Sequence, residues 1–156
     1  MPTTHPAIEA SDVGTFMSHL FGLDIDAAAS SAATPSPLGA LATYVDDQET
    51  VRGMMVCDVA GAAILGAALT QIPVGLVKDC IKDGELAGNL RENLAEVLNI
   101  AVNVFPSHQN NRLVLREVSY LDQIEMPESD GNWNSNEFTI DVARYGSGSL
   151  QIVQCG

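Results

Sequence analysis

Polar side chains recur at helical spacing in the stretch ELAGNLRENLAEVLNIAVNVF, which covers residues 85–105. At about 100° per residue, five of them share one narrow band of a helix: Glu85, Glu92, Glu96, Asn99 and Asn103. A glutamate and an asparagine three residues apart, such as Glu96 and Asn99, can present a carboxylate and an amide side by side. Such a pair can hydrogen-bond to a partner and can meet a positive charge.

Asparagine is a weak helix former, because its side chain competes for backbone hydrogen bonds. This stretch nevertheless holds four: Asn89, Asn93, Asn99 and Asn103. Stability alone would favour lysine, glutamate, glutamine or arginine on such a face, so binding is one interpretation. A merely solvated face is the other. Acidic side chains of the band could bind Mg²⁺, but carboxylates on a helix face are usually solvated, and we expect no metal site.

The opposite side of the same stretch is apolar and predicts a core-facing helix. Its residues are Leu86, Leu90, Leu94, Val97, Ala101 and Val104, widened by Leu98 and Phe105. Asp83 and Gly84 are the expected cap. Phe105-Pro106 is the expected end, because a residue before proline disfavours the helical region.

Other segments predict the elements that position this helix. A first helix capped by Ser11-Asp12 runs through Phe21, and a short helix runs from Pro73 to Gly84. The predicted strands are 41–45, 51–59, 62–69, 112–121, 137–145 and 149–153; loops cover 27–37 and 124–135, and Gly146-Ser147-Gly148 turns the last hairpin. Gly61 and Gly66 favour a strand over a helix in 62–69.

This order of elements predicts an α/β (α+β) fold, with a mixed, largely antiparallel sheet packed against two or three helices. The length of 156 residues suits a single domain, 1–156, in which residues 1–11 are a loose N-terminal segment.

The chain is strongly acidic, with a net charge of -13 and a pI near 4.2. Nucleic acid and anionic membrane surfaces are therefore poor partners, and no stretch is long enough for an apolar transmembrane span. Cys57, Cys80 and Cys155 are widely separated, which indicates neither a disulfide framework nor a zinc site. We expect Cys57 and Cys80 to be buried thiols and the protein to act in the cytoplasm.

Common catalytic motifs are absent from the sequence. There is no GxSxG elbow, GxGxxG loop or Walker pattern. His5, His19 and His108 lie in weak contexts, and Trp133 is expected to pack partly buried.

The run ENLAEVLNI, from Glu92 to Ile100, resembles the signature helix of the CheC/CheX family of chemotaxis phosphatases. In that family a glutamate is followed three residues later by an asparagine and then an apolar residue. The layout over residues 12–153 is also similar: a small-residue strand, a short helix, the signature helix, and strands that end in an aromatic-glycine hairpin, here residues 144–148.

This resemblance implies a CheC/CheX-like fold and dephosphorylation of the aspartyl phosphate of a CheY-type response regulator. The regulator supplies its own phosphoaspartate and Mg²⁺, so the phosphatase needs no cofactor of its own. By the same resemblance, Asn99 would orient the attacking water and Glu96 would pair with a basic residue of the regulator. Glu92 and Asn103 would contact the partner.

The first helix has no Glu-x-x-Asn, which matches the single-site, CheX-type members that commonly form homodimers. Glu92 stands where the family often has Asp or Ser, and Pro127 lies later than the usual proline. The alternative function is a CheC-like module that binds a partner in signalling or motility without catalysis.

Overall fold

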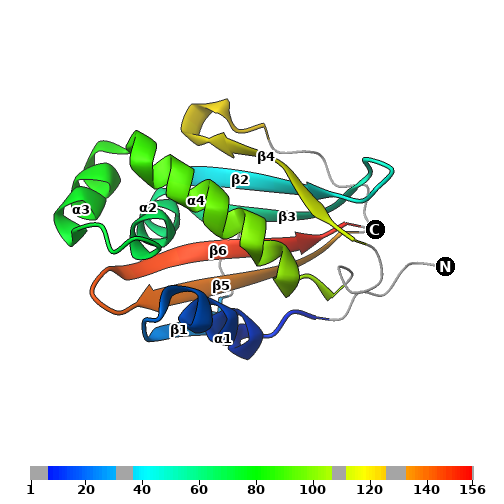
Figure 1. Ribbon diagram of the computed structural model, residues 1–156, viewed down its shortest axis with the longest axis horizontal. Helices are drawn as coiled ribbons and strands as arrows, with labels where there is room; N and C mark the ends of the chain where they lie inside the picture. Colours follow the sequence, from blue (N-terminus) through cyan, green and yellow to red (C-terminus); the bar gives the residue numbers. More distant parts are fainter. Residues whose placement is uncertain (1–6, 31–36, 107–111, 126–132, 156) are drawn as a thin grey trace.

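The computed structural model describes residues 7–30, 37–106, 112–125 and 133–155. Six strands form one antiparallel sheet in the order β1-β5-β6-β3-β2-β4 (Figure 1). They are β1 (Ile25–Ala29), β2 (Leu38–Val45), β3 (Val51–Asp58), β4 (Val114–Tyr120), β5 (Asn134–Val142) and β6 (Gly146–Gln154). The α-helices are α1 (Ala10–Phe21), α2 (Val59–Ala68), α3 (Val74–Asp83) and α4 (Gly88–Ile100). The short 3₁₀ helix η1 (Ala101–Val104) continues α4, and η3 (Leu121–Gln123) follows β4.

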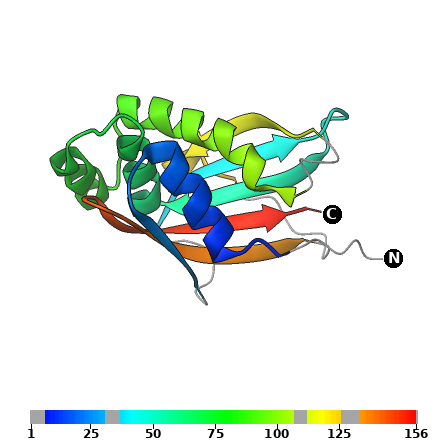
Figure 2. The ribbon, with the colours of Figure 1, turned by 60° about the horizontal axis from the view of Figure 1, so that its bottom comes forward.

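Helices α1, α2 and α4 lie over one face of this sheet, and α3 lies beyond one end of the strands (Figures 1 and 2). Alternate strand residues, such as Tyr44, Met55 and Ile152, meet the buried sides of these helices in the main core. The opposite face carries a smaller apolar cluster of Leu41, Met54, Val56, Val153 and Cys155. Trp133 packs partly buried against this cluster, as predicted.

The sheet is built from two similar successions of one helix and three strands. One is α1-β1-β2-β3 and the other is α4-β4-β5-β6. If each strand is exchanged for its counterpart, the sheet order reads the same from the opposite edge. The two successions meet in the central β3–β6 pair, where Met55 lies opposite Ile152. Helices α2 and α3 connect the first succession to the second, between β3 and α4.

Residues 62–68 belong to helix α2, so the strand predicted at 62–69 is wrong. Asp58 begins helix α2, and its carboxylate accepts the backbone N–H of Gly61 at 2.6 Å. Nine of the ten residues of α2 are buried, which removes the polar face that would have marked a helix in the sequence. Gly66 lies where α2 meets α4: a Cβ there would stand 2.5 Å from the carbonyl oxygen of Leu90.

Three smaller predictions are also wrong. Part of the expected loop 27–37 belongs to strand β1. The last hairpin turns at residues 143–145, and Gly146 already pairs with Val142. Gly84 ends α3 in a left-handed conformation instead of capping α4, so Glu85 lies outside the helix that was expected to carry it. The predicted α/β (α+β) fold with a largely antiparallel sheet is confirmed, and every described strand pair is antiparallel.

Most other elements are confirmed. The first helix and the short helix after Pro73 are present. The strands predicted at 41–45, 51–59, 112–121, 137–145 and 149–153 correspond to β2, β3, β4, β5 and β6, with ends within three residues of those predicted. Cys57 and Cys80 are buried thiols, as predicted, and Cys155 is buried as well. Burial raises the pKa of the Cys57 thiol to about 12.

Asp46 closes the β2–β3 hairpin, where a turn was predicted. One carboxylate oxygen accepts the backbone N–H groups of Gln48 at 2.9 Å and Thr50 at 3.0 Å. The other accepts Nε of Arg52 at 2.8 Å. The hydrogen bond from Arg52, followed by that from Thr50, holds the pKa of the Asp46 carboxyl below its usual range.

This lowered pKa predicts a loss of stability in acid. A carboxyl with a lower pKa in the folded than in the unfolded chain adds stability above its unfolded pKa, and that contribution is lost as the pH falls through the folded pKa. We expect Asp46→Asn to lower the free energy of unfolding at pH 7. The decline of that free energy below about pH 4 should be shallower than in the wild type. Urea denaturation at stepped pH measures both, and parallel curves for the two proteins would contradict the prediction.

Candidate partner-binding face of helix α4

Helix α4 runs diagonally over the sheet, with one side buried and one side exposed (Figure 1). Its buried residues are Leu90, Leu94, Val97 and Leu98, and Ala101 and Phe105 continue this apolar side beyond the helix. Phe105 is extended and precedes Pro106, so the helical stretch stops where the sequence predicts.

Four predicted site residues share the exposed side: Glu92, Glu96, Asn99 and Asn103. No described residue hydrogen-bonds to the side chains of Glu92, Glu96 or Asn99. Residues three apart on a helix have their Cβ atoms about 5–6 Å from each other, so Glu96 and Asn99 stand side by side toward solvent. Asn103 differs, because its amide nitrogen donates to the carbonyl of Ile100 at 2.9 Å. We call these four residues the α4 face.

The remaining asparagines of α4 have local roles. Asn93 donates to the carbonyl of Gly66 at 2.9 Å and to the hydroxyl of Thr70 at 2.8 Å, which ties α4 to α2. The side-chain oxygen of Asn89 accepts the N–H of Leu90 at 3.0 Å. Asn99 therefore stands apart from them, because its amide is exposed and engages no other described residue.

Two tyrosines that the sequence reasoning missed fix α4 in place. The Tyr44 hydroxyl donates to the carbonyl of Leu98 at 2.6 Å, one residue before Asn99. The Tyr120 hydroxyl donates to the carbonyl of Arg91 at 2.9 Å, and the Arg91 guanidinium lies 5.0 Å from the centre of the Tyr120 ring. Burial raises the pKa of Tyr44, so this hydroxyl stays protonated as the donor. For Tyr44, a tyrosine inside an apolar strand was the available signal, since a buried hydroxyl needs a partner.

Tyr44→Phe is expected to destabilise the protein by about 1–2 kcal/mol, because the Leu98 carbonyl loses its partner in a buried place. The ring and its packing on Phe105, 5.0 Å between ring centres, are kept. Thermal and urea denaturation measure the change. A variant as stable as the wild type would show that this hydrogen bond does not hold the end of α4.

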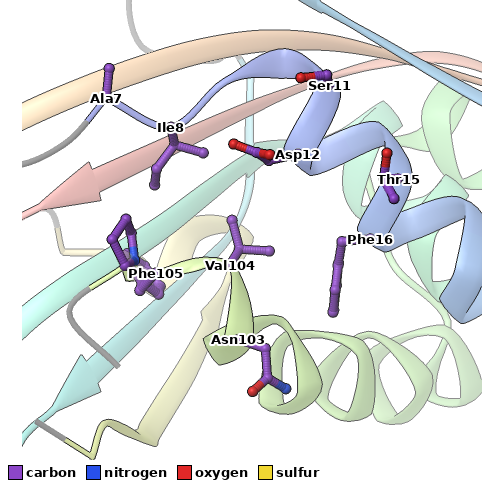
Figure 3. A pocket seen from close by; sticks show the side chains of 10 residues that line it. Ala7, Ile8, Ser11, Asp12, Thr15, Phe16, Asn103, Val104 and Phe105 are labelled. Atoms are coloured by element: carbon purple, nitrogen blue, oxygen red, sulfur yellow. The ribbon is translucent and has the colours of Figure 1, made fainter. Parts of the chain in front are cut away.

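A pocket of about 480 Å³ adjoins the C-terminal end of the α4 face. Its lining comes from the segment before α1, from α1 itself and from the stretch after α4: Ala7, Ile8, Ser11, Asp12, Thr15, Phe16, Asn103, Val104, Phe105 and Pro106. Figure 3 shows Asp12 and Phe16 projecting from α1 toward the segment that carries Asn103 and Val104. Asn103 thus belongs both to the α4 face and to the pocket.

Other candidate groups lie elsewhere. His19 is exposed on α1, and His5 and His108 fall outside the described residues. Within the described part of the chain, no three histidine, cysteine, aspartate or glutamate side chains gather closely enough to hold a metal ion. None of the described helices is both long and apolar enough to cross a membrane.

Comparison with protein-family models and with curated protein sequences finds no match. Solved structures do match. The FliM middle domain from H. pylori has a TM-score of 0.62 at 10% identity, over 94% of this chain and 84% of that one. A CheC-like superfamily protein from Shewanella sp. PV-4 has a TM-score of 0.52 at 10% identity, over 94% of each chain. Chemotaxis protein CheX from Vibrio vulnificus has a TM-score of 0.50 at 12% identity, over 91% and 90%.

Identities this low establish the fold and leave activity open. The chain has the CheC/CheX-like fold, as the signature helix predicted, and FliM middle domains share it. H. pylori FliM is also known in complexes with FliG and with SpeE.

Proposed function

We propose that the protein removes the phosphoryl group from the phosphoaspartate of a CheY-type response regulator, using the α4 face. The observation that carries this proposal is the exposed pair of Glu96 and Asn99, which has no partner among the described residues and sits on a helix of the CheC/CheX-like fold. The cytoplasm is the proposed compartment.

Each residue of the pair has its own role. The carboxamide of Asn99 holds a water molecule in line with the phosphorus atom, so that the protein contributes orientation and not a nucleophile of its own. The carboxylate of Glu96 pairs with a basic side chain beside the phosphoaspartate and fixes the docked geometry. Glu92 and Asn103 extend the contact along the face, and Mg²⁺ belongs to the regulator.

Rigid support for α4 favours this mechanism. Orientation of a water molecule contributes to rate only if the orienting group is itself held in place. The hydrogen bond from Tyr44 to the carbonyl of Leu98 lies in the same helical turn as Asn99. The amide of Asn103 secures the carbonyl of Ile100 on its other side.

Phosphate release from phosphorylated regulators of the same organism tests the proposal. Wild-type protein should accelerate release from at least one regulator, and Glu96→Gln should raise KM for it, because the charge pair is lost. Glu85→Gln is the matched control, since Glu85 is exposed but precedes α4. If no regulator loses phosphate faster with the wild-type protein, the catalytic proposal fails.

A second candidate is a non-catalytic binding module in signalling or motility. It is favoured by the similarity to the H. pylori FliM middle domain and to the FliM–SpeE complex, whose TM-scores of 0.62 and 0.64 exceed those of the CheC-like and CheX structures described above. FliM binds FliG and SpeE in its own complexes. Stable binding of a regulator or motility protein without phosphate release would favour this candidate over the phosphatase.

We also propose a homodimer, in keeping with CheX-type members. Strands β1 and β4 form the two edges of the sheet, and an edge strand offers unpaired backbone groups to a second copy. Val114 of β4 is 45% exposed. Light scattering during gel filtration measures the mass, and a monomer at micromolar concentration would contradict the proposal.

A further inference from the structure

We infer that the pocket between α1 and η1 receives a lysine or arginine side chain of the docked partner, with Asp12 meeting its positive charge. This inference rests on the proposed function, because it takes the partner to be a response regulator docked on the α4 face. It adds a second charge contact at a place that the Glu-x-x-Asn pair does not reach.

The floor of the pocket is apolar and fixed in place. Ile8 and Phe105 are 4% and 1% exposed, so both belong to the core. The backbone N–H of Ile8 donates to the side-chain oxygen of Asn136 at 3.3 Å, which anchors the segment before α1 to strand β5. Phe105 lies against Tyr44. An incoming side chain therefore meets a formed surface and need not order it first.

The walls favour a side chain with an aliphatic stem and a polar end. Phe16, Val104 and Pro106 are partly buried and offer apolar contact. Polar groups, among them Ser11 and Thr15, stand at the exposed rim. Lysine and arginine bury their methylene groups against apolar surface while the charged head stays near water, and a cation near the face of an aromatic ring such as Phe16 gains further attraction.

Charge selects a cation over the alternatives. Among the described residues of the lining, Asp12 is the only charged one, and no described residue pairs with its carboxylate. All seven lysines and arginines of the chain lie elsewhere, so none neutralises the pocket from within. An acidic side chain would be repelled by the Asp12 carboxylate, and a purely apolar one would gain no charge contact with it.

Position links this pocket to the α4 face. Asn103 lines the pocket and follows Asn99 by four residues, about 6–8 Å along the axis. One protein surface resting on Glu96 and Asn99 therefore extends over the mouth of the pocket. The partner is expected to place one basic residue against Glu96 and a second in the pocket.

The test compares Asp12→Asn with Asp79→Asn, an equal change of charge on an exposed residue of α3. The probe is a regulator trapped with Mg²⁺ and beryllofluoride, and its dissociation constant is measured by calorimetry at two salt concentrations. Asp12→Asn should weaken binding about fivefold and reduce its salt dependence, as for a partly exposed charge pair, and KM for phosphate release should rise with it. Asp79→Asn should match the wild type.

A double-mutant cycle identifies the occupant. Basic surface residues of the regulator are replaced singly by alanine. Replacing the residue that occupies the pocket should weaken binding to the wild-type protein but not to Asp12→Asn. Unchanged affinity in Asp12→Asn, or an equal loss in Asp79→Asn, overturns the inference while phosphate release leaves the proposed function standing. Weakened binding without any phosphate release supports the pocket and removes the catalysis. If no regulator binds, both proposals fail.

Discussion

Replacing Asn99 by alanine is expected to lower kcat for phosphate release about 100-fold or more, with little change in affinity for the regulator. The reason is that a misplaced reacting group costs rate on this scale, whereas Glu96 and its neighbours still hold the partner. The side chain is exposed and contacts no other described residue, so its removal leaves no cavity and no unpaired buried group.

Stability serves as the internal control for this prediction. Alanine is the better helix former by up to about 0.7 kcal/mol, so Asn99→Ala should unfold at the same urea concentration as the wild type or slightly above it. Asn93→Ala should instead unfold at a lower urea concentration than the wild type, because it loses the hydrogen bonds from Asn93 to the carbonyl of Gly66 and to the hydroxyl of Thr70. Normal kcat in a folded Asn99→Ala protein would remove Asn99 from the mechanism.

Replacing Gly66 by alanine is expected to destabilise the protein by about 1–3 kcal/mol, the usual cost of overpacking. The sign is opposite to that of helix propensity, which favours alanine over glycine by about 1 kcal/mol. The added Cβ would stand 2.5 Å from the Leu90 carbonyl oxygen. Since this neighbour is backbone, α4 as a whole must move, and kcat should fall together with stability.

Gly75→Ala is the matched control, because Gly75 lies in α3 and a Cβ there meets nothing within 4 Å. This variant should gain roughly 0.5–1 kcal/mol. Urea denaturation of both variants gives the comparison. If Gly66→Ala were as stable as Gly75→Ala, the approach of α2 to α4 would not be as close as described.

Periodicity in the sequence predicted the amphipathic helices, which have one solvent-exposed face and one buried face. Helix α4 was recognised because its apolar and polar residues alternate at helical spacing, and α1 and α3 follow the same rule. Helix α2 was not, since burial on all sides leaves no pattern to read. Strand β1 was missed as well, because five residues, mostly alanine, become a strand only by pairing with β5, more than a hundred residues later.

The candidate site divides in the same way. The α4 face could be predicted because its four residues lie within one short stretch. The separate role of Asn93 could not, since its partners Gly66 and Thr70 belong to another helix. The pocket could not be predicted from the sequence either, because its lining comes from two distant segments, residues 7–16 and 103–106.

The central β3–β6 pair has a consequence for biosynthesis. Strand β6 lies in the middle of the sheet, yet it is translated after the other five strands. While the chain emerges from the ribosome, the edge of β3 in the β2–β3 hairpin stays unpaired until β6 is made. Strand β1 likewise has no partner until β5 is made. Pairing over such long separations is slow, and open edges invite contact with other chains. A nascent chain of this fold is therefore a natural client for chaperones until residues 146–154 have been made.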